Sequence, residues 1–368
     1  KPSLDQIRER ATALRGRLAT LAPGGESDPL VPLRHRYLDR QLEALLARAR
    51  MLSGETLSFD QESAALYDAV APHHSAAHFD ALLAELDREL PGQGAVSERL
   101  ERFRQSYVIP PDRLSAVFDA AIAGCRERTE AHLELPDEES FTLEYVHDKP
   151  WSGYNWYQGN YRSLIQLNVD LPIFIDRAID LACHEGYPGH HVYNVLLEKN
   201  LVRDRGWVEL TVYPLFSPQS LIAEGSANYG IEIAFPGEDR LAFERDVLFP
   251  LAGLDPSAAA RYARIRGLSE KLAYAGNEAA RRYLDGAIGA EEAAEWLERY
   301  ALMSPERARQ RVRFFDTYRS YVINYNLGRD LVARWIEAQG GSEQNPEHRW
   351  ELFEQLLSTP RLPSSLVE

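Results

Sequence analysis

Residues 184–191 read His-Glu-Gly-Tyr-Pro-Gly-His-His, so one carboxylate stands beside one imidazole with two further imidazoles close behind. Residues 221–229 read Leu-Ile-Ala-Glu-Gly-Ser-Ala-Asn-Tyr and supply a second carboxylate, Glu224, within an apolar stretch. Two imidazoles, one carboxylate ligand and one carboxylate base are the components of a catalytic zinc site that keeps one coordination position open. The two segments therefore predict a metal site near the middle of the chain.

The spacing of the histidines is unusual for such a site. In the common zinc-peptidase motif, two histidines four residues apart project from one face of a helix. The fourth residue after His184 is Pro188, which offers no ligand atom, and the next histidines are residues 190 and 191. In a continuous helix seven residues rise about 10 Å, too far for two imidazoles that bind one zinc ion at about 2 Å each. We therefore expect Pro188 and Gly189 to interrupt the helix, because proline lacks a backbone donor and glycine adopts dihedral angles that other residues avoid.

This interruption assigns the ligands of one Zn²⁺ ion. With two residues looped out, His190 becomes the second histidine, and the expected ligands are His184, His190 and Glu224. His191 is the alternative ligand, or else a residue that orients a ligand from behind. Asn228 follows Glu224 by four residues on the same helix face, where it can hydrogen-bond the outer nitrogen of a ligand histidine.

Hydrophobic periodicity predicts a mainly α protein with one small β-sheet. Apolar residues recur at helical spacing through the first 135 residues and again from Pro172 to the C-terminus. Between these regions, residues 140–146 and 161–170 alternate as strands do. The small sheet should therefore lie next to the helix that carries the site.

We expect the longest helices over residues 256–285 and 304–338. The chain divides into an N-terminal helical region, 1–135, and a catalytic region, 136–368, or else the two form one continuous domain.

Composition restricts the partners. The net charge of −15 argues against a nucleic-acid partner, because proteins that bind a phosphate backbone usually carry a basic patch. No apolar run approaches the roughly 20 residues that span a membrane. Two cysteines, Cys125 and Cys183, make no disulfide framework, which favours a cytoplasmic location. An exported form stays open because the chain begins at Lys1 without an initiator methionine, and the sequence does not determine the oligomeric state.

Residues 184–191 match, at every fixed position, the His-Glu-x-x-Pro-Gly-His-His hallmark of the bacterial family catalogued as domain of unknown function 885, and the chain resembles that family. Gly189-His190-x-x-Tyr193 is distantly similar to the zinc motif of carboxypeptidase Taq. Residues 224–229 are similar to the third-ligand segment of the aminopeptidase N family. The resemblance implies a helical zinc-peptidase-like fold with a glutamate as third ligand. It extends over roughly residues 140–360.

The resemblance also points to the C-terminal helices. The family shows a Tyr-x-x-Gly segment, matched here by residues 325–328, whereas Tyr321 stands where the family has a glutamine. Glu185 is expected to act as the general base, and Tyr325, or failing that Tyr321, as the donor to the oxyanion. Tyr321 is also a candidate for contact with the substrate. Arg311 and Arg313 could bind a substrate carboxylate, and Arg313 is our candidate, although both also fit a solvated helix face.

Two further features compete for a role. Residues 164–169 precede the site and could be an edge strand that holds an extended substrate, or simply the sheet that supports the site helix. His74 and His78 have true four-residue spacing but lack a neighbouring glutamate, so an exposed pair is the favoured interpretation.

The sequence therefore predicts a zinc-dependent hydrolase, a metallopeptidase that cleaves short peptides or small amides. One alternative is a non-haem iron oxygenase, which uses the same two histidines and one carboxylate. Glu185 directly after the first ligand favours hydrolysis, because an oxygenase needs no base there. A non-catalytic binding protein on the same fold is the other alternative.

Overall fold

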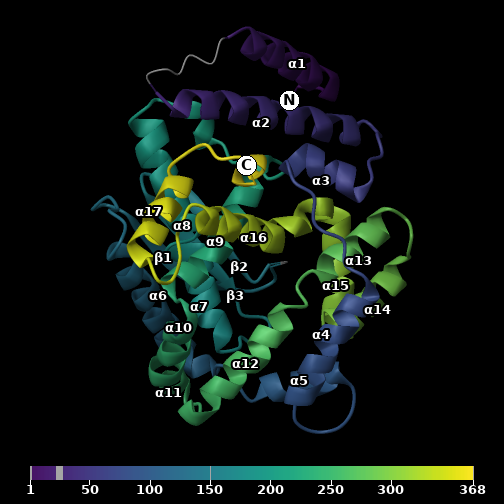
Figure 1. Cartoon of the computed structure of the whole chain (residues 1–368), viewed down its shortest axis with the longest axis vertical. Helices are drawn as coiled ribbons and strands as arrows, with labels where there is room; N and C mark the ends of the chain where they lie inside the picture. The colour runs from purple at the N-terminus through teal and green to yellow at the C-terminus, as the bar shows by residue number, and fades with distance from the viewer. Residues whose placement is uncertain (1, 22–27, 150, 368) are drawn as a thin grey trace.

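The computed structural model describes residues 2–21, 28–149 and 151–367. It confirms a mainly helical fold with one small three-stranded sheet. Within the described residues six α-helices precede the sheet, and Figure 1 shows them in purple and blue. This agrees with the helical periodicity of the first 135 residues. The six helices are α1 (Leu4–Thr20), α2 (Leu30–Leu52), α3 (Phe59–Tyr67), α4 (Ala76–Glu89), α5 (Val96–Gln105) and, after the short turn η1 (Pro111–Arg113), α6 (Leu114–Glu130).

The sheet contains β1 (Ser140–Val146), β2 (Gly153–Gly159) and β3 (Arg162–Asn168) in the order β1–β3–β2. β3 pairs in parallel with β1 and antiparallel with β2, so β3 is the central strand. The prediction that residues 164–169 form an edge strand is therefore wrong, because both sides of this segment are paired. β2 lies between the two segments predicted as strands, in a stretch with no predicted strand, and it is an edge strand.

The helices after the sheet surround the centre of the molecule. They are α7 (Asp176–Leu181), the π-helical turn η2 (Ala182–Gly186), α8 (His190–Leu197), η3 (Glu198–Arg203), η4 (Val208–Thr211), α9 (Pro218–Ala234), α10 (Gly237–Phe243), η5 (Glu244–Leu248), α11 (Phe249–Ala252), η6 (Pro256–Ala258), α12 (Ala259–Glu270), α13 (Ala275–Leu284), α14 (Ala290–Tyr300), α15 (Pro305–Tyr318), η7 (Arg319–Val322), α16 (Ile323–Ala338), α17 (Pro346–Leu357) and η8 (Pro363–Leu366). In the described chain no helix combines the length and apolar character needed to cross a membrane.

Both of the long helices expected from the sequence are interrupted. The first is divided into α12 and α13, and the second into α15 and α16. At the second break Arg319 has a φ of 53°, in the left-handed region. Glu62, a buried residue of α3, accepts hydrogen bonds there from the Ser320 backbone N–H at 3.1 Å and its hydroxyl at 2.6 Å, and from Arg319 Nε at 2.6 Å. A backbone donor is thus withdrawn from the helix by a distant carboxylate, which sequence periodicity cannot reveal.

The N-terminal helices pack directly on the helices that carry the site. α2 and α3 both contact α9, and Tyr37 of α2 donates a hydrogen bond to Gln219 of α9 at 2.8 Å. Buried side chains from Tyr37 to Leu366 belong to one contiguous hydrophobic core. In Figure 1, α2 and α3 lie above α9 and α16.

α9 and α16 cross in backbone contact. A methyl group added to Gly225 would lie 2.4 Å from the carbonyl carbon of Gly328, and one added to Gly328 would lie 2.7 Å from the Leu221 oxygen. No side chain fits between the two backbones at this point, so the close crossing requires glycine on both helices.

We predict that Gly225→Ala destabilises the fold by about 1–3 kcal/mol, because the new methyl group forces the crossing helices apart. Gly267→Ala is the matched control. Gly267 lies inside α12 with nothing within 4 Å of an added methyl group, so alanine there should stabilise the fold by about 0.5–1 kcal/mol. Urea denaturation of both variants measures the difference, and equal effects would contradict the proposed role of the crossing.

Candidate metal centre

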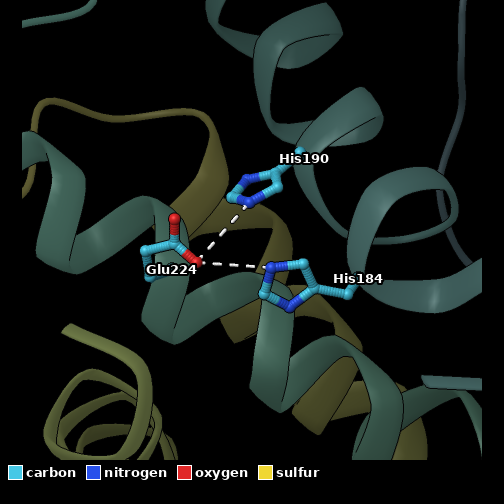
Figure 2. Close-up of side chains that lie close together, drawn as sticks. All are labelled: His184, His190 and Glu224. Atoms are coloured by element: carbon cyan, nitrogen blue, oxygen red, sulfur yellow. Dashed lines mark ion pairs between the residues drawn. The ribbon is translucent and has the colours of Figure 1, made fainter. Parts of the chain in front are cut away.

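His184, His190 and Glu224 converge on one point (Figure 2). Oε2 of Glu224 lies 3.3 Å from His184 Nε2 and 3.7 Å from His190 Nε2, and the three potential ligand atoms lie within 4.8 Å of one another. Tetrahedral zinc with bonds of about 2.1 Å separates its ligand atoms by about 3.4 Å. The three side chains therefore fit a zinc ion without rearrangement of the backbone.

Interruption of the helix brings His190 to His184. The π-helical turn η2 ends at Gly186, the Tyr187–Pro188 peptide bond is cis, and α8 begins at His190. Gly189 donates its backbone N–H to the Cys183 carbonyl at 2.9 Å. A methyl group on Gly189 would lie 2.0 Å from the His184 oxygen, so only glycine fits this turn. The loop expected at Pro188 and Gly189 is the feature that shortens the distance between the two histidines.

Glu224 has one satisfied oxygen and one free oxygen. Tyr321 donates its hydroxyl to Oε1 at 2.7 Å. Oε2 is buried and has no hydrogen-bond donor among the described residues. Burial raises the pKa of this carboxyl, but His184 and His190 outweigh that effect and hold the pKa well below its usual range. An ionised carboxylate oxygen that is buried without a donor favours a bound cation.

Asn228 fixes the tautomer of His184. Its Oδ1 lies 3.0 Å from His184 Nδ1, and its Nδ2 donates to the Tyr325 carbonyl at 3.0 Å. Because the amide nitrogen is committed to that carbonyl, the oxygen faces the imidazole and Nδ1 carries the proton. The lone pair of Nε2 is then directed toward Glu224, as a metal ligand requires.

His191 points away from this group. It is fully buried, with Nε2 2.6 Å from Glu139 and Nδ1 2.8 Å from Ser163. Tyr187 and Arg126 also donate to Glu139, at 2.7 and 2.8 Å. Burial alone raises the pKa of Glu139, but the hydrogen bonds from His191 and Tyr187 outweigh this effect, so the net shift of the pKa is downward. The structure thus gives His191 a role in anchoring α8 to the sheet, rather than that of an alternative ligand. The sequence gives no signal for Glu139.

The remaining predicted residues divide between the site and the surface. Glu185 is buried beside β2, where its Oε1 would lie 3.1 Å from a methyl group on Gly153. Tyr325 is close enough to Glu185 and Glu224 for both charges to raise the pKa of its phenol, after the larger effect of burial. Arg313 is exposed on α15, and its side chain contacts none of the triad residues in the described part of the chain. Arg311 is the arginine whose charge reaches Tyr325.

Sequence analysis missed two tyrosines near the triad. Tyr213 precedes α9, and Tyr154 lies on β2; the charge of Glu224 reaches both phenols. Their side chains are 41% and 39% exposed, so this side of the site is open to solvent. Burial is the first cause of the raised pKa of Tyr213, and the charge of Glu224 is the second.

The rival pair forms no metal site. His74 and His78 stack at 4.5 Å between ring centroids, and His74 packs against Tyr274 at 5.1 Å. Throughout the described ranges, the triad is the group of three ligand-type side chains that converges.

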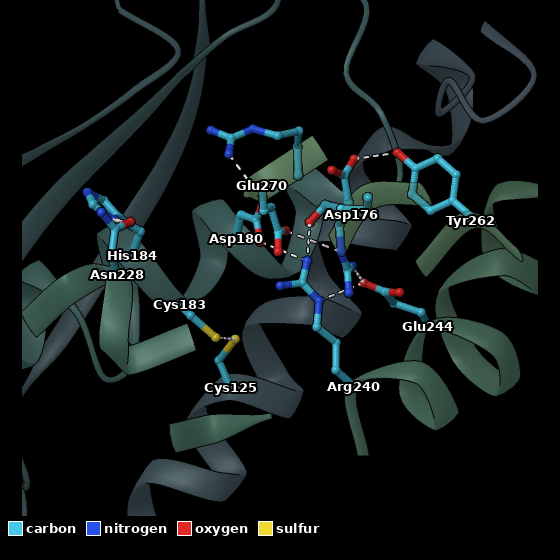
Figure 3. A network of polar contacts seen from close by, with 12 residues as sticks. Cys125, Asp176, Asp180, Cys183, His184, Asn228, Arg240, Glu244, Tyr262 and Glu270 are labelled. Carbon is cyan, nitrogen blue, oxygen red and sulfur yellow. Dashed lines mark hydrogen bonds and ion pairs between the residues drawn. The ribbon is translucent and has the colours of Figure 1, made fainter. Parts of the chain in front are cut away.

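A buried charge network supports the helix that leads into the site (Figure 3). Arg240 of α10 pairs with Asp180 of α7 and with Glu244, each at 2.8 Å. α7 continues directly into η2, which carries His184. Nearby, the thiols of Cys125 and Cys183 lie 2.6 Å apart and link α6 to the same turn. The position of His184 therefore depends on contacts from α6 and α10.

We predict that His190→Ala lowers zinc affinity at least about 100-fold, since loss of an outer partner alone costs about 10- to 100-fold. His191→Ala should retain zinc but lose about 2 kcal/mol of stability, because Glu139 loses a buried partner. Zinc titration against a chelator, together with urea denaturation, separates the two effects. Loss of zinc binding in His191→Ala with His190→Ala unaffected would reverse the assignment.

The Arg240–Asp180 pair predicts a pH-dependent loss of stability. Burial raises the pKa of Asp180, but Arg240 leads the charges that outweigh it, so its folded pKa lies below the unfolded value. This contribution is present above about pH 4 and disappears as pH falls through the folded pKa. Arg240→Met should therefore destabilise by about 3–5 kcal/mol at pH 7 and by less near about pH 3.

Arg245→Met is the control for that experiment, because its pair with Asp246 is exposed and its loss should leave stability unchanged. Urea denaturation at both pH values gives the comparison. A loss in Arg240→Met that is equal at the two pH values would exclude the ionised Asp180 as its cause.

Comparison with known proteins identifies the fold but no family. No family model and no curated protein matches the chain. A solved protein from Colwellia psychrerythraea, described as a "putative lipoprotein", aligns at 12% identity over 100% of this chain and 69% of its own, with a TM-score of 0.59. A "putative lipoprotein of unknown function" from Shewanella oneidensis aligns at 13% identity over 96% and 73%, with a TM-score of 0.48. At this identity the Colwellia structure shows similarity of fold alone.

Proposed function

We propose that this chain is a zinc-dependent hydrolase, a metallopeptidase that cleaves short peptides or small amides. The observation that carries the proposal is the convergence of His184 and His190 on the donor-free oxygen of Glu224, at the separations that one zinc ion requires. Glu185 directly follows the first of these histidines, at the position that a general base needs.

A zinc ion held by these three residues would polarise the substrate carbonyl and make water more acidic. The role of Glu185 follows from its fixed position. Asn155 of β2 donates to the Glu185 backbone oxygen at 2.7 Å, and Gly153 leaves room for the carboxylate. Glu185 takes a proton from water as the water oxygen bonds to the carbonyl carbon. It then passes that proton to the amide nitrogen as the carbon–nitrogen bond breaks, which yields a carboxylic acid and an amine.

Two tyrosines next to the triad, Tyr321 and Tyr325, have different roles. Tyr321 already donates to Glu224, so it holds a ligand in position. The Tyr325 hydroxyl makes no hydrogen bond to the described residues, and the phenol is close enough to Glu224 and Glu185 for both charges to raise its pKa, after the larger effect of burial. Because burial keeps its pKa well above the ordinary value, this phenol stays protonated and can donate to the oxyanion.

The edge strand favours a peptide substrate. β2 pairs on one side with β3, contacts η2 and presents Tyr154 and Trp156, which are 39% and 48% exposed. An extended peptide can pair with such an edge while its side chains contact the aromatic rings. The same strand holds Asn155, which fixes Glu185, so substrate and base would be positioned by one element.

Two observations bear on the cellular location of the protein, and they point in different directions. Cysteine usage favours the cytoplasm, whereas the description of the Colwellia protein as a lipoprotein favours the cell envelope. Fractionation of the native host decides between them.

We predict that Glu185→Gln lowers kcat by about 10²- to 10⁴-fold without loss of zinc, because only proton transfer is removed. Mass spectrometry of a peptide mixture after incubation with zinc-loaded protein measures the cleavage. Glu232→Gln is the matched control, because this α9 glutamate is 40% exposed and pairs with Arg329 away from the triad.

Three results would contradict the proposal. Full hydrolysis by zinc-loaded Glu185→Gln excludes the base. Iron in the purified protein supports the oxygenase alternative, and absence of any tightly bound metal supports a binding protein.

A further inference from the structure

Arg311 is a partly buried arginine without a partner. Its Nε is buried and makes no hydrogen bond, and no carboxylate of the described residues forms an ion pair with it. The guanidinium instead stacks on Phe314 and Phe315, with its central carbon 4.4 and 5.7 Å from their ring centroids. Because arginine stays protonated in proteins, this leaves a positive charge without a counter-charge on an apolar wall.

The wall belongs to the candidate site. Arg311, Phe314 and Tyr318 follow one another at helical spacing along α15, so they share a face. The Tyr318 ring lies 6.1 Å from the ring of Tyr321, whose hydroxyl donates to Glu224. The charge of Arg311 also reaches Tyr325, the candidate oxyanion donor.

Several arginines lie near this wall, although the chain has a net charge of −15. Arg307, one turn before Arg311, is exposed and has no ion pair among the described residues. Burial lowers the pKa of Arg307, and the charges of Arg104 of α5 and Arg177 of α7 lower it further; the charge of Arg177 reaches His184 as well.

Nearby carboxylates do not neutralise both α15 arginines. Arg104 lies 3.9 Å from Asp176, and Arg177 pairs with Asp180 at 3.2 Å. Glu101 and Glu306 act on Arg307 at longer range than an ion pair. The positive charge at Arg311 is therefore uncompensated, and an anionic ligand would satisfy it.

We propose that Arg311 binds a carboxylate of the substrate, so that the enzyme selects short peptides with a free carboxyl end. The planar guanidinium matches a carboxylate through two parallel hydrogen bonds, and the rings of Phe314 and Phe315 hold it in place. Arg307 draws the same anion toward the site from its exposed position. This inference rests on the proposed hydrolase function, whose substrate class it specifies.

The test compares three probes: tetra-alanine with a free carboxyl end, tetra-alanine amide, and Ala-Ala-Ala-Glu amide. The wild-type enzyme should cleave the free acid with a kcat/KM roughly 10- to 100-fold above that of tetra-alanine amide. Arg311→Met should abolish this preference, and Arg311→Lys should restore part of it. Rescue of the amide by its glutamate side chain would assign the site to a side-chain carboxylate instead of the chain terminus.

Arg313→Met is the matched control, because Arg313 lies on the same helix but is exposed. It should keep the full preference for the free acid. Arg311→Met should also melt no lower than the wild type, because the variant loses no ion pair or side-chain hydrogen bond among the described residues, and the methionine side chain can still pack on Phe314 and Phe315. Equal cleavage of acid and amide by the wild type, an unchanged preference in Arg311→Met, or loss of preference in Arg313→Met would overturn the proposal.

Calorimetric binding of the same peptides to zinc-loaded Glu185→Gln separates the two proposals. Preferential binding of the free acid without hydrolysis by the wild type would reject the hydrolase and retain the carboxylate site. Hydrolysis of both peptides without any binding preference would retain the hydrolase and reject the carboxylate site.

Discussion

The candidate metal centre depends on the contact between the backbones of α9 and α16 at Gly225 and Gly328. Helices with side chains at the crossing would lie further apart, whereas here the methyl-free positions let the two chains touch. The crossing brings Glu224 against Tyr321 and sets Asn228 under the Tyr325 carbonyl. One ligand, the partner of another ligand and the candidate oxyanion donor are therefore positioned by a single packing contact.

Local chemistry made the triad predictable from the sequence, and distant contacts made the rest unpredictable. The ligand types lie within two short segments, and the conflict between histidine spacing and helix rise points directly to Pro188 and Gly189. By contrast, the partner of His191 is Glu139, 52 residues away, and the sequence around either residue does not predict that they pair. The pairing of β2 beside β3 is likewise decided by the tertiary fold rather than by the strand's own pattern.

Helical periodicity alone could have distinguished Arg311 from Arg313. Arg311 precedes Tyr325 by about four helical turns, so even a continuous helix would place the two on one face, whereas Arg313 falls off it. The break at Arg319 could not be anticipated in this way, because the carboxylate that causes it comes from α3. Periodicity identifies the face of a helix but not the point at which another element ends it.

The contact of Glu62 with Ser320 spans 258 residues of sequence and makes the C-terminal helices α15 and α16 dependent on the N-terminal helices. The angle between α15 and α16 determines how Arg311 lies relative to Tyr321 and Tyr325. That angle is fixed by Glu62, which belongs to neither helix. The half of the chain that carries the ligands is therefore not a transferable module. Sequence changes in α3 could alter the substrate side of the candidate site while His184, His190 and Glu224 stay unchanged.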